Sequence, residues 1–404
     1  MMVWLFWLFV GLVFYTYVGY PLALTVLARL RPKQGAYPPH LPSVTLLIAA
    51  YNEELTIGAK LENSLALDYP SNKLQILIAV DGSNDRTHEI VDRYAAQGVE
   101  LSYSPARGGK MAAINRAMLQ ARGEIIVFSD ANNMYQANTV RELVNPFVDQ
   151  TVGAVSGAKR IVKGDGALAD SEGFYWRYES FIKKQETRLG CCTGVAGEIL
   201  AIRRDLFEPA PDNVINDDFF MTIQLIKRGH RVVYAPQARS SERVSASAQD
   251  EVTRRARIIA GRYQVMGMAH RLLPWRRPLV AWQIVSHKFL RPLVPLGMIG
   301  ALLTTILAIL FPALAVNRPL PFLSAAAGWM ILLLLQLAFY GLAWLGDRKE
   351  RDGRLGKILY LPTFLVASNI AALIGLQRYL TKQQTTMWQR VRRRDLPHVE
   401  TTET

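Results

Sequence analysis

The sequence predicts an α/β fold, a mostly parallel sheet flanked by helices, joined to α-helical transmembrane segments. Between about residues 41 and 278, short runs rich in Val, Ile and Leu alternate with helical patterns. Such alternation is typical of a parallel sheet with helices on its faces. Long apolar runs stand near both ends of the chain, and crossing the hydrocarbon core of a membrane takes about 20 apolar residues.

The composition narrows the classes of partner. Of the 404 residues 50% are hydrophobic, and the formal net charge is +14. Because Arg and Lys cluster beside the apolar runs, the charge favours a membrane surface, so we expect membrane lipids and no nucleic acid as partners. Cys191 and Cys192 are adjacent, a spacing that seldom forms a disulfide and fits no metal site. We expect two small buried residues in a reducing compartment.

Residues 1–30 are expected to form an N-terminal transmembrane anchor. The apolar run is longer than a signal-peptide core and lacks a basic leader and a small-residue cleavage site. Arg29, Arg31 and Lys33 follow directly, so the positive-inside rule places the next segment in the cytoplasm. We therefore expect an integral protein of the plasma (inner) membrane, with a Pro-rich linker over residues 31–42 and a cytoplasmic domain after it.

The C-terminal part, residues 292–380, is expected to form a transmembrane bundle. Three of its stretches are long enough to span a membrane: 292–316, 322–345 and 358–380. Together with the anchor they would place the basic tail, residues 381–404, outside, whereas the positive-inside rule prefers it inside. Either 358–380 is re-entrant, or 279–291 makes an extra crossing, or the rule fails here. The number of spans and the side of the C-terminus therefore stay open.

The middle domain, residues 43–240, is expected to alternate strands and helices, with interfacial helices after it over 241–291. The predicted strands cover 44–51, 74–80, 99–104 and 124–132, and the predicted helices lie between them. In parallel sheets, ligands bind at the carboxyl ends of strands. Polar clusters follow three of these strands, at residues 51–54, 81–87 and 130–133. We expect the functional site at that edge.

The residue types in these clusters suit a phosphorylated ligand and a hard cation. Asp130 and Asn132 stand two residues apart, so their oxygens can share Mg²⁺ or Mn²⁺ while a diphosphate completes the shell. Lys110 follows two glycines at a predicted helix start, where backbone N–H groups and the helix dipole favour phosphate. Asp81 opens a turn, and aspartates also favour turns and helix caps for structural reasons alone. Asp217 and Asp218 stand among apolar residues, where a carboxylate must be hydrated, paired or put to work.

Taken together and in order, these motifs resemble the family 2 glycosyltransferases. More narrowly, they resemble the membrane-embedded branch that contains cellulose, chitin, hyaluronan and poly-N-acetylglucosamine synthases. The motifs that carry the resemblance are AAYNEE (49–54), VDGSNDRT (80–87), RGGK (107–110), SDANN (129–133), TGVAGE (193–198) and INDD (215–218). The resemblance covers most of the chain and implies a GT-A type nucleotide-sugar-binding domain.

The resemblance also implies roles for single residues. The donor side would be formed by Ala50, Tyr51, Glu53, Asp81, Lys110, Asp130, Ala131, Arg254 and Arg257. Asp130 and Asn132 would hold the metal, and Thr193 and Gly194 would lie beside the acceptor. Asp218 matches the catalytic base of the family's T-E-D motif, and Asp217 stands where relatives usually have glutamate, which implies a supporting role.

Two departures from the family pattern bear on the mechanism. Asn132 replaces the second acid of the D-x-D motif, so the cation should bind more weakly. Many processive members carry Q-x-x-R-W on an interfacial helix; here Arg254 or Arg255 stands for the glutamine and Ile258 for the tryptophan. The arginines can still hold a diphosphate, but the apolar platform for an acceptor sugar is lost. Trp388 resembles a membrane-proximal tryptophan of relatives and could equally be an interface anchor.

The implied reaction is inverting transfer from a nucleoside-diphosphate sugar, with UDP the expected nucleotide, assisted by Mg²⁺ or Mn²⁺. The expected acceptor is a growing polysaccharide at the cytoplasmic membrane face, with or without extrusion. The alternative is non-processive transfer of one sugar to a membrane lipid. A scaffold with a dead catalytic domain would have lost its acids, whereas Asp81, Asp130 and Asp218 are all present. The identity of the sugar depends on a few pocket contacts that the sequence does not reveal.

Overall fold

The computed structural model describes residues 1–32, 35–162, 167–211, 213–243, 245, 247–315, 317–348 and 354–383. Trp388 and nearly all of the basic tail lie outside these residues. The chain divides into two compact units. One, here called the membrane unit, holds Met1–Leu30, Arg255–Ala269 and Trp275–Gln384. The other, here called the sheet unit, holds Arg31–Arg254 and His270–Pro274.

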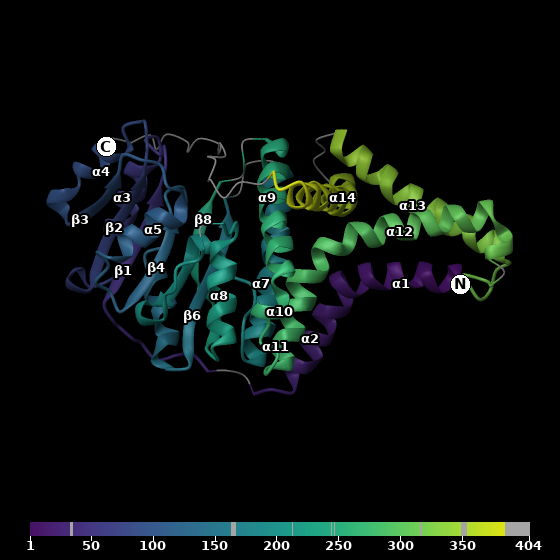
Figure 1. The fold of residues 1–404 in the computed structure, drawn as a ribbon, viewed down its shortest axis with the longest axis horizontal. Helices are drawn as coiled ribbons and strands as arrows, with labels where there is room; N and C mark the ends of the chain where they lie inside the picture. The colour runs from purple at the N-terminus through teal and green to yellow at the C-terminus, as the bar shows by residue number, and fades with distance from the viewer. Residues whose placement is uncertain are drawn as a thin grey trace. The chain divides into compact units, whose positions relative to one another are not determined.

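The described part of the sheet unit contains an eight-stranded sheet in the order β3-β2-β1-β4-β7-β6-β8-β5 (Figure 1). The strands are β1 Val44–Ala50, β2 Leu74–Asp81, β3 Val99–Ser104, β4 Ile125–Asp130, β5 Met134–Tyr135, β6 Val152–Ile161, β7 Leu200–Arg203 and β8 Arg231–Glu242. Strands β3, β2, β1 and β4 are mutually parallel, as predicted. Strand β7 runs antiparallel to both β4 and β6 and makes the sheet mixed.

The register of the parallel half aligns the strand ends that carry the polar clusters. Ala50 pairs with Val80 and Ala49 pairs with Asp130, so β1, β2 and β4 all end at the same edge. The strands form because their β-branched and aliphatic side chains are buried on both faces. Each fully buried Val, Leu or Ile stabilises the fold by about 1.5–3 kcal/mol relative to an exposed one. Burial therefore fixes the edge at which the polar residues meet.

Short helices connect and cover these strands (Figure 1). They are α3 Ile57–Leu65, α4 Thr87–Asp92, α5 Lys110–Met118, α6 Thr139–Val144, α7 Ala167–Leu189 and α8 Asp217–Lys227. Helix α3 begins only at Ile57, because Asn52 has a positive φ of 53° and residues 52–56 form a turn. This turn keeps the polar residues after β1 at the edge of the sheet.

In the membrane unit, four helices among the described residues are long and apolar enough to cross a membrane: Met2–Arg29, Pro278–Leu310, Ala325–Gly346 and Leu361–Leu380. The first comprises α1 Met2–Phe14, a π-helical turn Tyr15–Gly19 and α2 Tyr20–Arg29. The second comprises α11 Pro278–Ile284, a π-helical turn Val285–Phe289 and α12 Leu290–Leu310. The other two lie in α13 Ala325–Arg348 and α14 Arg354–Leu380.

The two composite helices bend where their π-helical turns lie (Figure 1), as expected for such turns. Hydrogen bonds join the first π-helical turn to the second composite helix. The Tyr15 hydroxyl lies 2.8 Å from Ser286 Oγ and accepts the indole N–H of Trp282 at 2.8 Å. Residues 279–291 continue directly into α12. That helix ends at Leu310, short of the expected 316, because Pro312 follows.

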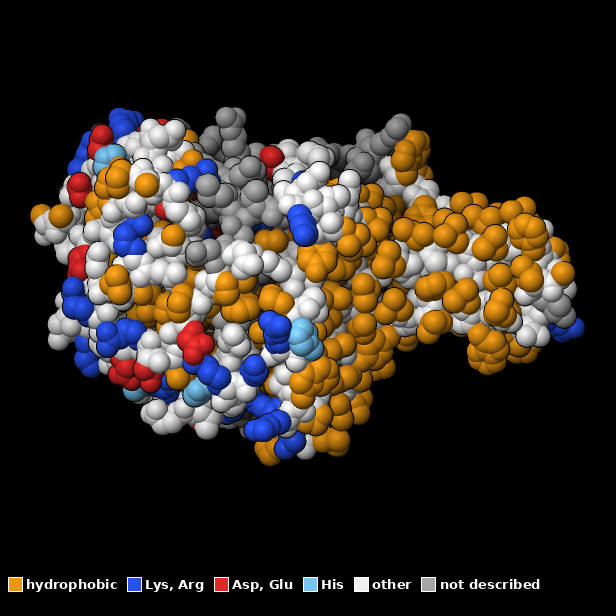
Figure 2. Space-filling model, in the orientation of Figure 1, with side chains coloured by type: hydrophobic (Ala, Val, Ile, Leu, Met, Phe, Trp, Pro, Cys, Tyr) orange, Lys and Arg blue, Asp and Glu red, His pale blue; other side chains and the backbone are white. Residues whose placement is uncertain are grey.

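Apolar side chains cover the outside of the membrane unit. Figure 2 shows them gathered over α1, α12 and α13. Exposed examples are Trp4, Leu8, Leu303, Leu334, Leu335 and Trp344. Soluble proteins rarely expose apolar patches of more than a few hundred Å², so a lipid environment accounts for this surface.

Candidate active site

Asp81, at the end of β2, anchors the loop that precedes α5. Its carboxylate oxygens accept the backbone N–H groups of Gly108 (2.9 Å) and Gly109 (2.7 Å). Gly82 follows at φ +58°, and a Cβ there would lie 2.6 Å from the backbone N of Arg107. Only glycine fits this approach. The aspartate expected to hold the nucleoside thus also fixes the RGGK loop at the edge of the sheet.

Lys110 forms an ion pair with one carboxylate and feels the charge of two more. Its Nζ pairs with Asp130 Oδ1 at 2.8 Å. Burial acts to lower the pKa of Lys110, but the negative charges of Asp130, Asp217 and Asp218 outweigh burial and raise it above the ordinary value. Residues from three separate sequence motifs are therefore brought together, one cation with one carboxylate from β4 and two from α8.

Asp217 and Asp218 begin α8, and their environments differ. The backbone N–H of Phe219 donates to Asp218 Oδ1 at 2.7 Å, and Phe219 itself is buried. Burial raises the pKa of Asp218 to about 6, and the adjacent charge of Asp217 adds to the increase. An acid whose pKa lies nearer neutrality is a better proton acceptor at physiological pH. This is the property expected of a general base.

The turn after β1 supplies an aromatic ring and structural hydrogen bonds. The guanidinium of Arg107 lies 3.9 Å from the ring centroid of Tyr51, a cation–π contact. Glu53 is 3% exposed and accepts the Thr56 hydroxyl at 2.6 Å, so its carboxylate holds the turn before α3. Ala50 and Ala131 are buried. Tyr51 is half-buried and therefore more accessible than Ala50, Glu53 and Ala131.

The TGVAGE motif, predicted to lie beside the acceptor, makes contacts inside the domain and one close approach to Asp218. Thr193 is 1% exposed, and both its N–H and its hydroxyl bind the carboxylate of Glu186, each at 2.8 Å. The carbonyl of Gly194 accepts the thiol of Cys192 at 3.1 Å. These contacts hold the motif inside the domain. Gly197, in the same motif, lies against Asp218, because an added Cβ would lie 3.0 Å from Asp218 Oδ2. Both cysteines are free and buried, as expected.

The two arginines of the expected diphosphate clamp stand on helix α9, Ala248–Gly267. Arg254 belongs to the sheet unit and pairs with Glu251, with N···O distances of 2.6 and 3.0 Å. Arg257 belongs to the membrane unit. The contact of Arg254 with Glu251 holds its guanidinium on the helix, so a role at the diphosphate requires this ion pair to be shared or exchanged.

Three candidates received no individual role from the sequence: Lys60, and also Asn133 and Glu198, which stand inside the quoted motifs. Lys60 is fully buried and donates to the backbone oxygen (2.8 Å) and Oδ1 (3.0 Å) of Asn133. Burial lowers the pKa of Lys60 to about 7, and the charge of Asp130 opposes the decrease. Glu198 is paired with Lys159 at 3.1 Å, and its charge acts on both Asp130 and Asp218. The signal that could have indicated Lys60 is a lysine on the apolar face of a predicted helix.

The donor set around Asp130 suits a hard divalent cation. Asp130 offers a carboxylate and Asn132, which is half-buried two residues on, offers an amide oxygen. The ammonium of Lys110, 2.8 Å from Asp130, shows that this carboxylate already accepts a positive charge. Within the described residues no group of three His, Cys, Asp or Glu side chains could hold a metal by itself. A cation here would therefore share its shell with a ligand such as a diphosphate.

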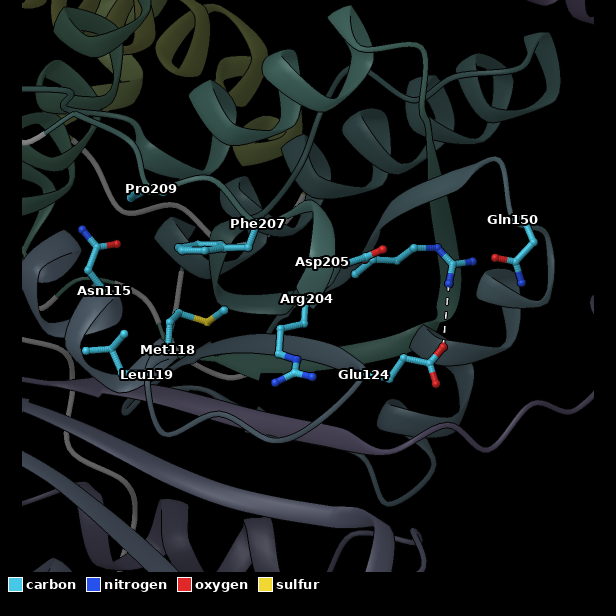
Figure 3. A pocket seen from close by; sticks show the side chains of 10 residues that line it. Asn115, Met118, Leu119, Glu124, Gln150, Arg204, Asp205, Phe207 and Pro209 are labelled. Atoms are coloured by element: carbon cyan, nitrogen blue, oxygen red, sulfur yellow. Dashed lines mark ion pairs between the residues drawn. The ribbon is translucent and has the colours of Figure 1, made fainter.

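A separate hollow of about 770 Å³ lies at the other end of β4 (Figure 3). It is lined by Asn115, Met118, Leu119, Glu124, Gln150, Arg203, Arg204, Asp205, Phe207 and Pro209. Glu124 precedes β4 and pairs with Arg203 at 3.9 Å, whereas Asp130 ends that strand. The hollow therefore lies apart from the carboxylates described above.

Comparison with known proteins agrees with this geometry. Residues 45–209 match the model of glycosyl transferase family 2. The chain is 27% identical to the probable glycosyltransferase YdaM of Bacillus subtilis, over 51% of this chain and 52% of that protein. It is 30% identical to beta-monoglucosyldiacylglycerol synthase of Synechocystis, over 46% and 40%. It is 28% identical to poly-beta-1,6-N-acetyl-D-glucosamine synthase of Staphylococcus aureus, over 49% of both chains.

The matched part thus spans about half, or less, of the length of each of these relatives. Among solved structures, the mannosyltransferase PcManGT from Pyrobaculum calidifontis, in complex with GDP-Man and Mn²⁺, superposes with a TM-score of 0.68 at 21% identity. The superposition covers 92% of this chain and 99% of that one, which establishes a shared fold. Residues 45–209 therefore form a glycosyl transferase family 2 domain of the GT-A type.

Proposed function

We propose that this protein transfers a sugar, with inversion, from a nucleoside-diphosphate sugar to an acceptor at the cytoplasmic face of a membrane. The observation that carries the proposal is the ion pair of Lys110 with Asp130, together with the charges of Asp217 and Asp218 that act on the same ammonium group. One carboxylate is available for a cation and its diphosphate, and another for the acceptor proton. UDP is the expected nucleotide.

In this mechanism the residues have separate tasks. Asp81 and Tyr51 bind the nucleoside, while Asp130 and Asn132 hold Mg²⁺ or Mn²⁺, which when bound neutralises the leaving diphosphate. Lys110 would leave Asp130 for the phosphates, and Arg254 would add charge to them.

Asp218 accepts the proton of the acceptor hydroxyl as that oxygen attacks the anomeric carbon. Attack on the face opposite the leaving diphosphate inverts the configuration. The raised pKa of Asp218, about 6, supports this role. Asp217 contributes by keeping that pKa high, so its role is to tune the base.

The acceptor proposed first is a growing polysaccharide. The poly-beta-1,6-N-acetyl-D-glucosamine synthase relative supports it, together with four helices that could form a membrane path. The second candidate is a membrane lipid that receives one sugar. The beta-monoglucosyldiacylglycerol synthase relative supports this candidate, as does Ile258 at the position where processive members carry a platform tryptophan.

Product size separates the two acceptors. Purified protein in lipid nanodiscs would be incubated with Mn²⁺ and a panel of radiolabelled sugar nucleotides, and the products separated by gel and by organic extraction. Long water-soluble products support the polysaccharide, and single-sugar lipids support the second candidate. Absence of transfer from every donor in the panel would refute the proposed function.

A further inference from the structure

We propose that Asn133 is a positioning residue that sets the metal-side carboxylate, Asp130, at a fixed distance from the base, Asp218. This inference rests on the proposed function. Asn133 is fully buried, and it lies three residues after Asp130 in the turn that leaves β4. The family motif uses Asp130 and Asn132, so the sequence alone indicates no role for Asn133.

The side chain of Asn133 is held on one side by the strand and helix beneath the site. Its Oδ1 accepts the Ser129 hydroxyl at 2.9 Å and the ammonium of Lys60 at 3.0 Å. Lys60 also donates to the backbone oxygen of Asn133 at 2.8 Å. A charged donor makes these bonds stronger than neutral ones. The amide group is therefore fixed relative to β4 and α3.

On the other side, Asn133 binds the turn that contacts the base. Its Nδ2 donates to the carbonyl of Glu198 at 2.8 Å, and the Tyr135 hydroxyl lies 2.9 Å from the same oxygen. Gly197, the next residue back, packs on Asp218: an added Cβ would lie 3.0 Å from Oδ2 and 3.1 Å from the aspartate Cβ. A continuous path of contacts thus runs from the Asp130 turn through Glu198 and Gly197 to Asp218.

The chemical reason for such a link is the geometry of inversion. The diphosphate would be fixed through Asp130, and the acceptor oxygen through Asp218, so their separation sets the approach to the anomeric carbon. Misplacement by about 1 Å can cost on the order of 100-fold in rate. Loss of the link should therefore lower kcat and leave donor affinity nearly unchanged.

The variant Asn133→Asp tests the link selectively. It keeps an oxygen for Ser129 and Lys60 but replaces the N–H donor to Glu198 by an acceptor. The matched control is Asn63→Asp, because Asn63 accepts from the backbone N–H of Tyr135 (2.8 Å) and donates to its carbonyl (2.9 Å). Its amide thus binds the backbone of Tyr135 and not the Glu198 carbonyl, which Tyr135 contacts through its hydroxyl. We expect kcat to fall about 10- to 100-fold in Asn133→Asp. In the same variant, KM for the donor and the affinity for its nucleoside diphosphate with Mn²⁺ should stay within about threefold of the unmodified protein. In Asn63→Asp, kcat should change little.

A second variant, Gly197→Ala, acts at the other end of the path and does not touch Lys60. Its added methyl would displace the Asp218 carboxylate, so we expect the same loss of kcat with unchanged nucleoside-diphosphate affinity. All measurements use the full chain in nanodiscs and the sugar nucleotide that the unmodified protein turns over best. Wild-type kcat in Asn133→Asp, or equal losses in Asn133→Asp and Asn63→Asp, would overturn the inference alone. An unmodified chain that turns over no donor would overturn the proposed function with it.

Discussion

Asp217 and Asp218 share one turn of helix and are both half-buried, yet the Phe219 N–H and the contact with Gly197 are features of Asp218. The sequence motif selects the second aspartate by resemblance, and the structure supplies a physical reason for an unequal pair. Their difference leads to two predictions at the scale of single residues.

Asp218→Asn should abolish transfer while donor binding remains. The asparagine keeps an oxygen for the Phe219 N–H but cannot accept the proton of the acceptor hydroxyl. It should also make the protein more stable at pH 8, because the raised pKa means that the ionised carboxylate destabilises the fold. A shift from 3.8 to about 6 corresponds to on the order of 1–3 kcal/mol. Thermal unfolding and calorimetry with the nucleoside diphosphate measure both effects, and full transfer activity in this variant would sink the assignment.

The pH dependence of kcat/KM should show the ionisation of Asp218. The base acts as a carboxylate, so activity should fall as pH decreases through about 6. The charge of Asp217 raises that pKa, and its removal in Asp217→Asn should lower it. We therefore expect the acidic limb of the profile to move to lower pH in this variant. A limb that stays in place, or moves to higher pH, would show that another group controls it.

At the scale of secondary-structure elements, sequence patterns located β1 to β4 because each strand is a continuous buried run followed by a turn. They did not identify β5, β6, β7 or β8, and the antiparallel β7 contributes four residues, Leu200–Arg203, to the centre of the sheet. They also gave no individual role to Lys60, Asn133 or Glu198, whose roles depend on contacts 65 to 73 residues apart in the chain. A local sequence pattern predicts that a motif lies at the end of a strand. It does not predict which distant residues contact that motif in the fold.

The turn after β2 gives a prediction at this scale. Gly82 and Gly98 both have a positive φ, +58° and +88°. A Cβ added at Gly82 would lie 2.6 Å from the backbone N of Arg107, whereas a Cβ added at Gly98 would have nothing within 4 Å. Gly98→Ala should therefore cost about 1–2 kcal/mol from the backbone alone and leave donor affinity intact. Gly82→Ala should also displace the RGGK loop and weaken nucleoside-diphosphate binding about tenfold or more. Equal affinities in the two variants would argue against a donor role for that loop.

At the scale of the whole molecule, the chain combines a sheet unit with a membrane unit, and the boundary falls inside α9, between Arg254 and Arg255. The sequence predicted long apolar segments at both ends, and the four apolar helices agree with that pattern. It did not predict the bends, because the π-helical turns at Tyr15–Gly19 and Val285–Phe289 depend on polar contacts between distant helices.

The orientation of the chain across the membrane is the prediction that belongs to this scale. Arg29 and Arg31 follow the first span, so the positive-inside rule places the sheet unit in the cytoplasm, where sugar nucleotides are made available. One crossing by Pro278–Leu310 then puts the loop at Arg318 on the outside. Both positions can be probed because the native cysteines are buried, and Gln97 and Arg318 are exposed.

A membrane-impermeant maleimide should label Arg318→Cys in intact cells and Gln97→Cys only in inside-out vesicles or after lysis. The unmodified chain, with Cys191 and Cys192 buried, serves as the background control. Labelling of Gln97→Cys from the outside of intact cells would place the sheet unit on the other side. A cytoplasmic nucleotide could not then reach the carboxylates at Asp130 and Asp218, and the donor proposed for this protein would have to be abandoned along with its orientation.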